Sequence, residues 1–68
     1  MPKLYSSEYI IKILFRNGFF FVSQKGSHIK LKHINDNRVV IVPDNRREIP
    51  IGTFKSILRQ SGLSSDMF

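Results

Sequence analysis

The 68-residue sequence contains no cysteine and only two histidines. Neither a disulfide framework nor a structural zinc site can therefore stabilise the chain, and a domain of this size must rely on one hydrophobic core. Hydrophobic residues make up 41% of the sequence and include six phenylalanines, which bury a large apolar area per residue. We expect a single folded domain over residues 1–68 rather than a disordered chain.

Acidic residues are also few. Five of them stand against 11 lysines and arginines, which gives a net charge of +6. This excess indicates a polyanionic partner, with nucleic acid as the leading class. The sequence has no apolar run long enough to cross a membrane and no signal-peptide pattern, and the lack of cysteine fits a reducing compartment. We therefore expect a cytoplasmic protein with no membrane partner.

Two segments have apolar residues at helical spacing. The first helix is expected over residues 7–17, where Ser6 or Ser7 can act as the cap and Gly18 ends the helix. The second begins just after Pro50 and closes at Gly62, and residues 64–68 beyond it are expected to fray. The apolar stripe of the first helix consists of Ile10, Ile11, Leu14 and Phe15. That of the second consists of Ile51, Phe54, Ile57 and Leu58.

Between these helices the sequence predicts three short strands, over residues 19–24, 27–34 and 38–42. Lys25-Gly26 is predicted to form a two-residue hairpin turn, and residues 35–37 are predicted to form a second turn. The predicted fold is α+β in the order α-β-β-β-α, with a three-stranded antiparallel sheet and two helices on one of its faces.

Strand alternation turns this fold into a prediction of two sheet faces. If Lys25-Gly26 is the turn, one face is apolar and packs against the helices. Its residues are Phe20, Val22, Ile29 and Leu31. The open face then carries His28, Lys30, Lys32, Phe19, Phe21 and Ser23. His33 lies on the face opposite to His28 and is interpreted as structural. The face of each third-strand residue stays open, because a two-residue and a three-residue loop predict opposite registers.

Several motifs in this order resemble the HicA family of mRNA interferase toxins. They are Asn17-Gly18-Phe19, Gln24-Lys25-Gly26-Ser27-His28, Val42-Pro43, the segment from Gly52 to Leu58, and Gly62-Leu63. The resemblance implies a fold like the double-stranded-RNA-binding domain, in agreement with the pattern above. It also implies that His28 carries RNA cleavage and that a HicB-type antitoxin binds the toxin and blocks this site.

One position departs from the family pattern. Many members carry a second histidine shortly after the proline that ends the third strand, and this sequence has Asn45 there. An amide exchanges no proton near neutral pH, so any proton transfer at that position is lost. A role in binding or orientation could survive the replacement.

A ribonuclease that needs no metal or other cofactor fits these residues. RNA supplies its own nucleophile, the 2′-hydroxyl, and histidine, with an ordinary pKa of about 6.5, suits His28 as general acid or base. The residues predicted to bind RNA are Lys25, Gly26, Ser27, Lys30 and Lys32. Phe19, Phe21, Arg46 and Arg47 are predicted as a surface for stacked bases or for the antitoxin. The two lysines on the strand could also be ordinary solvated residues. The alternative function is a non-catalytic RNA-binding module of the same fold.

Overall fold

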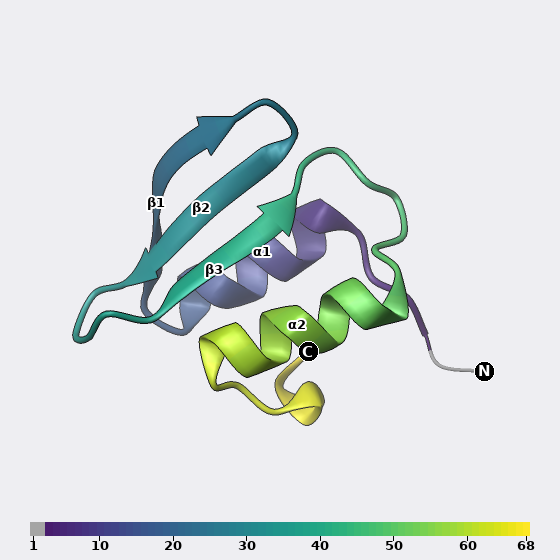
Figure 1. The fold of residues 1–68 in the computed structure, drawn as a ribbon. Helices are drawn as coiled ribbons and strands as arrows, with labels where there is room; N and C mark the ends of the chain where they lie inside the picture. Colours follow the sequence, from purple (N-terminus) through teal and green to yellow (C-terminus); the bar gives the residue numbers. More distant parts are fainter. Residues whose placement is uncertain (1–2) are drawn as a thin grey trace.

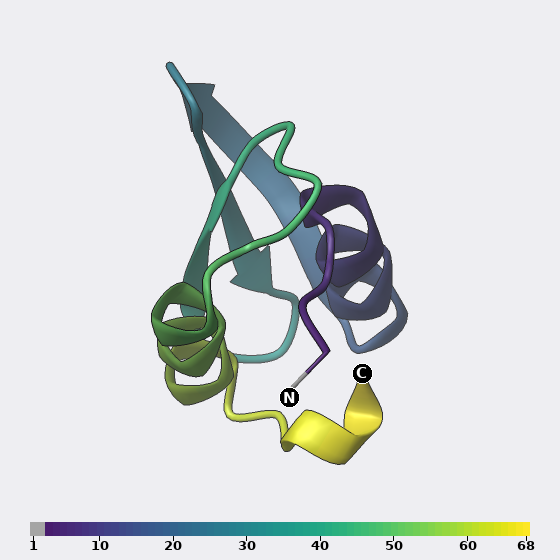
Figure 2. The same cartoon turned by 90° about the vertical axis from the view of Figure 1, so that its right-hand side faces the viewer.

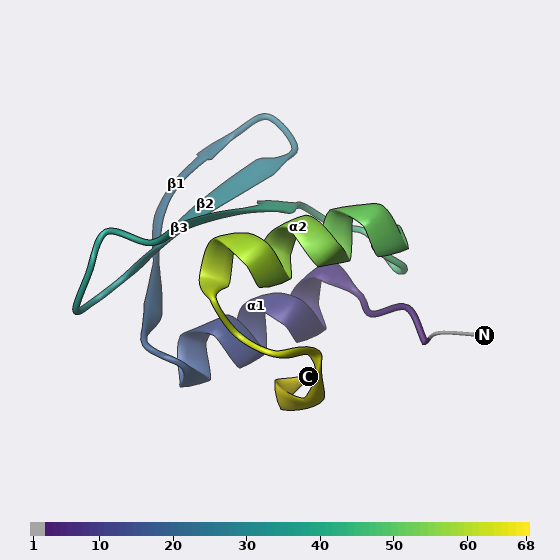
Figure 3. The same cartoon turned by 60° about the horizontal axis from the view of Figure 1, so that its bottom comes forward.

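In a computed structural model, which describes residues 3–68, the elements follow the predicted order. They are α1 (Ser7–Arg16), β1 (Phe19–Lys25), β2 (His28–His33), β3 (Val39–Pro43), α2 (Ile51–Ser61) and a short 3₁₀ helix, η1 (Ser65–Met67). The strands form one antiparallel sheet in the order β1-β2-β3, and both helices lie on the same side of it (Figures 1 and 3). The predicted α-β-β-β-α fold with one open sheet face is confirmed.

The helix ends follow the predicted local chemistry. Ser6 caps α1 by accepting a hydrogen bond from the backbone N–H of Tyr9 at 3.1 Å. Gly18, with φ at +90°, turns the chain from α1 into β1. Gly62 ends α2 in the left-handed conformation, and its N–H donates to the carbonyl oxygen of Leu58.

The hydrophobic core lies between the helices and the covered face of the sheet. Its residues are Ile10, Leu14, Phe19, Ile29, Leu31, Val40, Val42, Ile49, Phe54 and Ile57. Ile49 belongs to the loop before α2 and has no periodic pattern to reveal its burial; its N–H donates to the carbonyl oxygen of Tyr5. Phe15 and Ile51, which the helical stripes placed inward, are exposed instead.

The register between β1 and β2 differs from our prediction. The hairpin turn is Gly26-Ser27 rather than Lys25-Gly26, and Lys25 pairs directly with His28. A β-bulge between Phe21 and Ser23 then shifts the pairing by one residue, so that Phe20 pairs with Lys32. Because a shift of one residue moves every side chain to the other face, the faces of the three phenylalanines are inverted with respect to the prediction.

The inversion corrects the predicted surface. Phe19 is 3% exposed and lies in the core, so its assignment to the open face is wrong. Phe21 pairs with the buried Leu31 and therefore lies on the helix side of the sheet, not on the open face. It is nevertheless 52% exposed, on the edge strand β1. Phe20, predicted to face the core, lies on the open face.

The structure also decides the register of β3. Val40 and Val42 pair with Leu31 and Ile29, and all four side chains are buried. Ile41, between the two valines, pairs with Lys30 on the open face. The sheet therefore presents the odd-numbered residues of β3 to its open side.

The C-terminal residues are more ordered than the sequence predicted. The ring of Phe68 lies 5.2 Å from that of Phe54 and 6.4 Å from that of Tyr5, measured between centroids. Its carbonyl oxygen accepts a hydrogen bond from the hydroxyl of Tyr9. Figure 2 shows η1 passing below α2 and returning towards α1. The expectation that residues 64–68 fray is wrong for Phe68, because its ring completes an aromatic cluster.

Candidate active site

The open face of the sheet displays the predicted histidine together with the predicted lysines. His28, Lys30 and Lys32 alternate along β2 with Ile29 and Leu31, which are buried under the helices. His28 and Lys30 are exposed, and Lys32 is partly exposed. The alternation therefore places all three on one side of the sheet, as predicted.

His28 lines an open hollow of about 560 Å³ on this face. The hollow is formed by Ser23, Lys25, His28, Lys30 and Ile41. Lys25 is the direct cross-strand partner of His28, and such pairs have Cβ atoms about 4.5–5.5 Å apart. Lys30 lies two residues along the same strand, a rise of about 6.6 Å. A phosphate bound at His28 would thus be within reach of two ammonium groups.

The charge of this face is of one sign. The strand residues that pair across it are Phe20, Ser23, Lys25, His28, Lys30, Lys32, Val39, Ile41 and Pro43. None of them is acidic, so the cations on the face have no carboxylate beside them in the sheet. A face of this kind attracts an anionic ligand.

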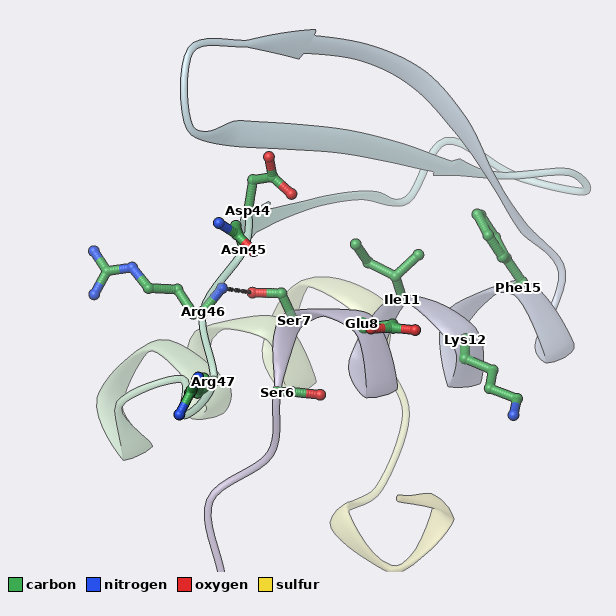
Figure 4. A pocket seen from close by; sticks show the side chains of 10 residues that line it. All are labelled: Ser6, Ser7, Glu8, Ile11, Lys12, Phe15, Asp44, Asn45, Arg46 and Arg47. Carbon is green, nitrogen blue, oxygen red and sulfur yellow. Dashed lines mark hydrogen bonds between the residues drawn. The ribbon is translucent and has the colours of Figure 1, made fainter.

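The turn beside His28 is held by Gln24, which the sequence analysis named only as part of a motif, and by Asp44, which it did not name. The N–H of Asp44 donates to the carbonyl oxygen of Ser27 at 2.7 Å. The amide of Gln24 donates to the Asp44 carboxylate at 2.8 Å and to the carbonyl oxygen of Gly26 at 3.1 Å. Figure 4 shows Asp44 pointing towards the hairpin. The two bonds made by Asp44 connect residues 17 and 20 positions apart, so no local motif predicts them.

Arg46 and Arg47 do not join His28 on the open face. They line a separate groove of about 720 Å³ between α1 and the loop that follows β3 (Figure 4). Ser7 also lines the groove, and its hydroxyl donates to the carbonyl oxygen of Pro43 and accepts from the N–H of Arg46. In Figure 4 the side chain of Arg46 extends away from α1, whereas Ile11 points towards the sheet.

Asn45 lines the same groove rather than the hollow around His28. Its φ is +56°, a left-handed conformation that asparagine tolerates better than most residues with a side chain. The neighbouring Asp44 is the residue bonded to the hairpin turn. Asn45 therefore has a clear backbone role at this position, and its amide supplies no proton exchange.

His33 lies on the helix side of the sheet, and its ring nitrogens are used for local hydrogen bonds. Nδ1 accepts from the N–H of Asn35 at 3.1 Å, which requires that nitrogen to be unprotonated. Nε2 then carries the proton and donates to the carbonyl oxygen of Asn17, also at 3.1 Å. The ring packs edge-on against Phe19. This geometry supports the interpretation of His33 as structural.

Within residues 3–68, no three side chains of the metal-ligating kinds are gathered closely enough to hold an ion. None of the helices in that part of the chain has the length and apolar character needed to span a bilayer.

Comparison with known proteins identifies the family to which the chain belongs. The family model for the HicA toxin of bacterial toxin–antitoxin systems matches residues 7–63, from the first residue of α1 to Leu63. The match thus includes the whole sheet, the hairpin turn and all the lining residues of the groove except Ser6. No curated protein matches the chain. Because the family model covers most of the sequence, the chain belongs to the HicA toxin family.

Proposed function

We propose that this chain is an mRNA-cleaving endoribonuclease in which His28 acts as the acid–base residue and no metal ion is required. Family membership implies an RNA substrate and an antitoxin partner. The observation that carries the proposal is the position of His28, exposed on the open face, opposite Lys25 and two residues from Lys30. The exposed imidazole of His28 is accessible to a bound RNA strand, and the lysines beside it attract the phosphate.

The proposed reaction uses the 2′-hydroxyl of the substrate. Its oxygen attacks the adjacent phosphorus, the O2′–P bond forms, and the bond from phosphorus to the 5′ oxygen of the next nucleotide breaks. His28 accepts the 2′-hydroxyl proton as a general base, donates a proton to the leaving 5′ oxygen as a general acid, or does both in turn, and water carries out the transfer that His28 does not. Lys25 and Lys30 stabilise the charge on the non-bridging oxygens. The products carry a 2′,3′-cyclic phosphate and a 5′-hydroxyl.

The turn and the next lysine extend this site along the substrate. Gly26 has φ at +60° and no neighbouring atom within 4 Å of the place where a Cβ would be, so the phosphate backbone can approach closely there. The exposed Ser27 offers a hydroxyl next to His28. Lys32 lies farther along β2, where we place a neighbouring phosphate.

We further propose a HicB-type antitoxin as the partner, and the cytoplasm as the place where both act. The net charge of +6 favours an acidic protein surface. Phe21, Arg46 and Arg47 remain available for this contact, since all three are exposed and lie away from the open face. Phe19, buried in the core, takes no part in it.

A non-catalytic RNA-binding module is the second candidate, and one observation favours it. Asn45 stands where the family pattern has a second histidine, so a proton-transferring group is absent there. This candidate keeps the RNA contacts of the open face and predicts that His28 can be replaced without functional loss.

The decisive experiment compares wild-type protein with His28→Ala on single-stranded RNA in the presence of EDTA. We expect the wild type to cleave and the variant to lose at least about 100-fold in rate, the usual contribution of a general acid or base. Lys55→Ala, which removes an exposed cation from α2, is the matched control and should cleave normally. Equal cleavage by wild type and His28→Ala would reject the catalytic assignment, and binding without cleavage by both would favour the non-catalytic module.

Growth provides a second readout of the same variants. Induced expression of the wild type should arrest growth, and His28→Ala should not, although its exposed position predicts a thermal unfolding curve like that of the wild type. Co-expression of the antitoxin should restore growth. Arrest of the same extent by the His28→Ala protein would separate toxicity from this residue.

A further inference from the structure

The open face carries exposed apolar side chains in addition to its cations. Phe20 is 45% exposed and pairs with Lys32, and Ile41 is 37% exposed and pairs with Lys30. Neither helix covers them, because both helices lie on the other side of the sheet (Figure 3). The bulge in β1 is what brings Phe20 to this face, while Phe19 and Phe21 point to the helix side.

An occupant of this face must satisfy both features. It has to be anionic, because the paired positions hold three lysines and a histidine and no acid. It also has to present flat apolar groups, because a phenylalanine ring and an isoleucine lie between the cations. Single-stranded RNA meets both conditions, since its unpaired bases can stack on an aromatic ring while its phosphates bind lysine. In a duplex the bases are stacked on one another and cannot reach the ring.

We propose that Phe20 is a stacking platform for one unpaired base of the RNA substrate, with Lys32 holding the phosphate beside that base. This inference rests on the proposed function, which identifies RNA as the substrate. It adds that the bound RNA is single-stranded and that one base binds at a subsite away from the cleaved bond. Ile41 pairs with Lys30, which lies between Lys32 and His28 on β2, and it provides apolar surface between the subsite and His28.

The sheet geometry also gives the distance between the subsite and the cleaved bond. Phe20 stands opposite Lys32, which is four residues from His28 on β2 and thus about 13 Å away along the strand. A stacked strand of nucleic acid advances about 3.4 Å per nucleotide, and a splayed one advances farther. The stacked base therefore lies about two to four nucleotides from the scissile phosphate.

The binding test uses a short single-stranded oligonucleotide with 2′-fluoro sugars, which lacks the nucleophile and is not cleaved. Phe20→Ala should weaken its binding about 5- to 150-fold, the range for removal of one base–aromatic stack. Phe20→Trp should retain binding. The matched control is Phe15→Ala, which removes a phenylalanine of similar exposure, 52%, from α1 and should bind like the wild type. Unchanged binding by Phe20→Ala would overturn the proposal.

The position of the stacked base is tested by a single ribonucleotide placed in the same 2′-fluoro strand, so that only one bond can be cleaved. Abasic substitutions are then moved outward from this bond. An abasic substitution at one position, two to four nucleotides from the cleavable bond, should slow cleavage by the wild type. The same substitution should have little further effect on cleavage by Phe20→Ala. If every abasic position affected both proteins equally, Phe20 would contact no base.

The outcomes separate this inference from the proposed function. Should His28→Ala cleave like the wild type while Phe20→Ala still loses binding to the uncleavable strand, the stacking subsite stands and the catalytic assignment fails. If Phe20→Ala binds RNA normally but no longer binds the antitoxin, the platform serves a protein partner and the inference is wrong. Preference of the wild type for a duplex over a single strand would also overturn it.

Discussion

Gly18 illustrates how one residue controls the connection between α1 and the sheet. Its φ is +90°, and a Cβ built on it would lie 2.8 Å from Nε2 of His33, closer than van der Waals contact allows. That nitrogen is hydrogen-bonded to the carbonyl oxygen of Asn17 and has little freedom to move. Both the backbone conformation and the available space therefore require glycine.

Gly18→Ala should consequently destabilise the protein by more than about 1 kcal/mol, since the alanine is strained at this φ and displaces the imidazole. Gly52→Ala is the matched control. A Cβ at Gly52 meets nothing within 4 Å, its φ is not in the left-handed region, and alanine favours the helix, so stability should rise by about 0.5 kcal/mol. Urea denaturation measures both changes. A loss of similar size in the two variants would contradict this reasoning.

The loop between β2 and β3 is held to α2 through Arg38. Its guanidinium donates to the Asp36 carboxylate at 2.9 and 3.0 Å and to the carbonyl oxygen of Ser61, near the end of α2. It also lies 5.5 Å from the centre of the Phe19 ring. Hydrogen bonds from the Arg38 side chain, and then from its backbone N–H, lower the pKa of the Asp36 carboxyl.

This shift predicts a pH dependence of stability. The pKa of Asp36 is lower in the folded state than its ordinary value of about 3.9, so its contribution is fully present above about pH 4 and is lost as the pH falls through the folded-state pKa. Asp36→Asn should therefore be less stable than the wild type at neutral pH, and the difference should shrink below about pH 4. Chemical denaturation across this range gives the two curves.

Arg38→Met supplies the control for that prediction. In this background the carboxylate has lost its main partner, so Asp36→Asn should have a smaller and less pH-dependent effect. An undiminished effect of Asp36→Asn in the Arg38→Met protein would show that Arg38 is not the cause.

For the whole molecule, the decisive feature is that the two helices cover only one side of a three-stranded sheet (Figure 3). The covered side uses most of the large aliphatic residues, and the open side collects His28 and three lysines. Basic residues on the helices, such as Lys12 and Lys55, are exposed elsewhere. The paired positions of the open face hold three of the 11 lysines and arginines and none of the five acidic residues, so half of the net charge of +6 lies at the proposed RNA site.

The salt dependence of RNA binding tests this distribution. Removing two phosphate contacts with Lys30→Ala and Lys32→Ala should reduce the slope of log K against log salt by about 1.4, since each contact to a single strand contributes about 0.7. The control combines Lys12→Ala with Lys55→Ala, which removes the same charge from the helices and should leave the slope nearly unchanged. Equal slopes for the two double variants would mean that RNA binding does not depend on the open face.

Much of the fold could be predicted from local patterns. The apolar spacing, the serine cap and the glycines predicted the order of helices and strands, because these signals act within a few residues. The common face of His28, Lys30 and Lys32 was predictable for the same reason, since alternation along one strand needs no partner strand. The HicA motifs likewise predicted the family that the comparison confirmed.

The pairing of strands and the contacts between distant segments were decided by the tertiary structure. A bulge after Phe21 puts Phe19 in the core and Phe20 on the open face. The bonds from Asp44 to the hairpin turn join segments that lie far apart in the sequence. The physical reason is that the stable register is the one that gives the lowest free energy for the packing of the whole core. Alternation within a strand is a property of a few neighbouring residues, whereas the partner of each residue depends on how all the buried side chains pack.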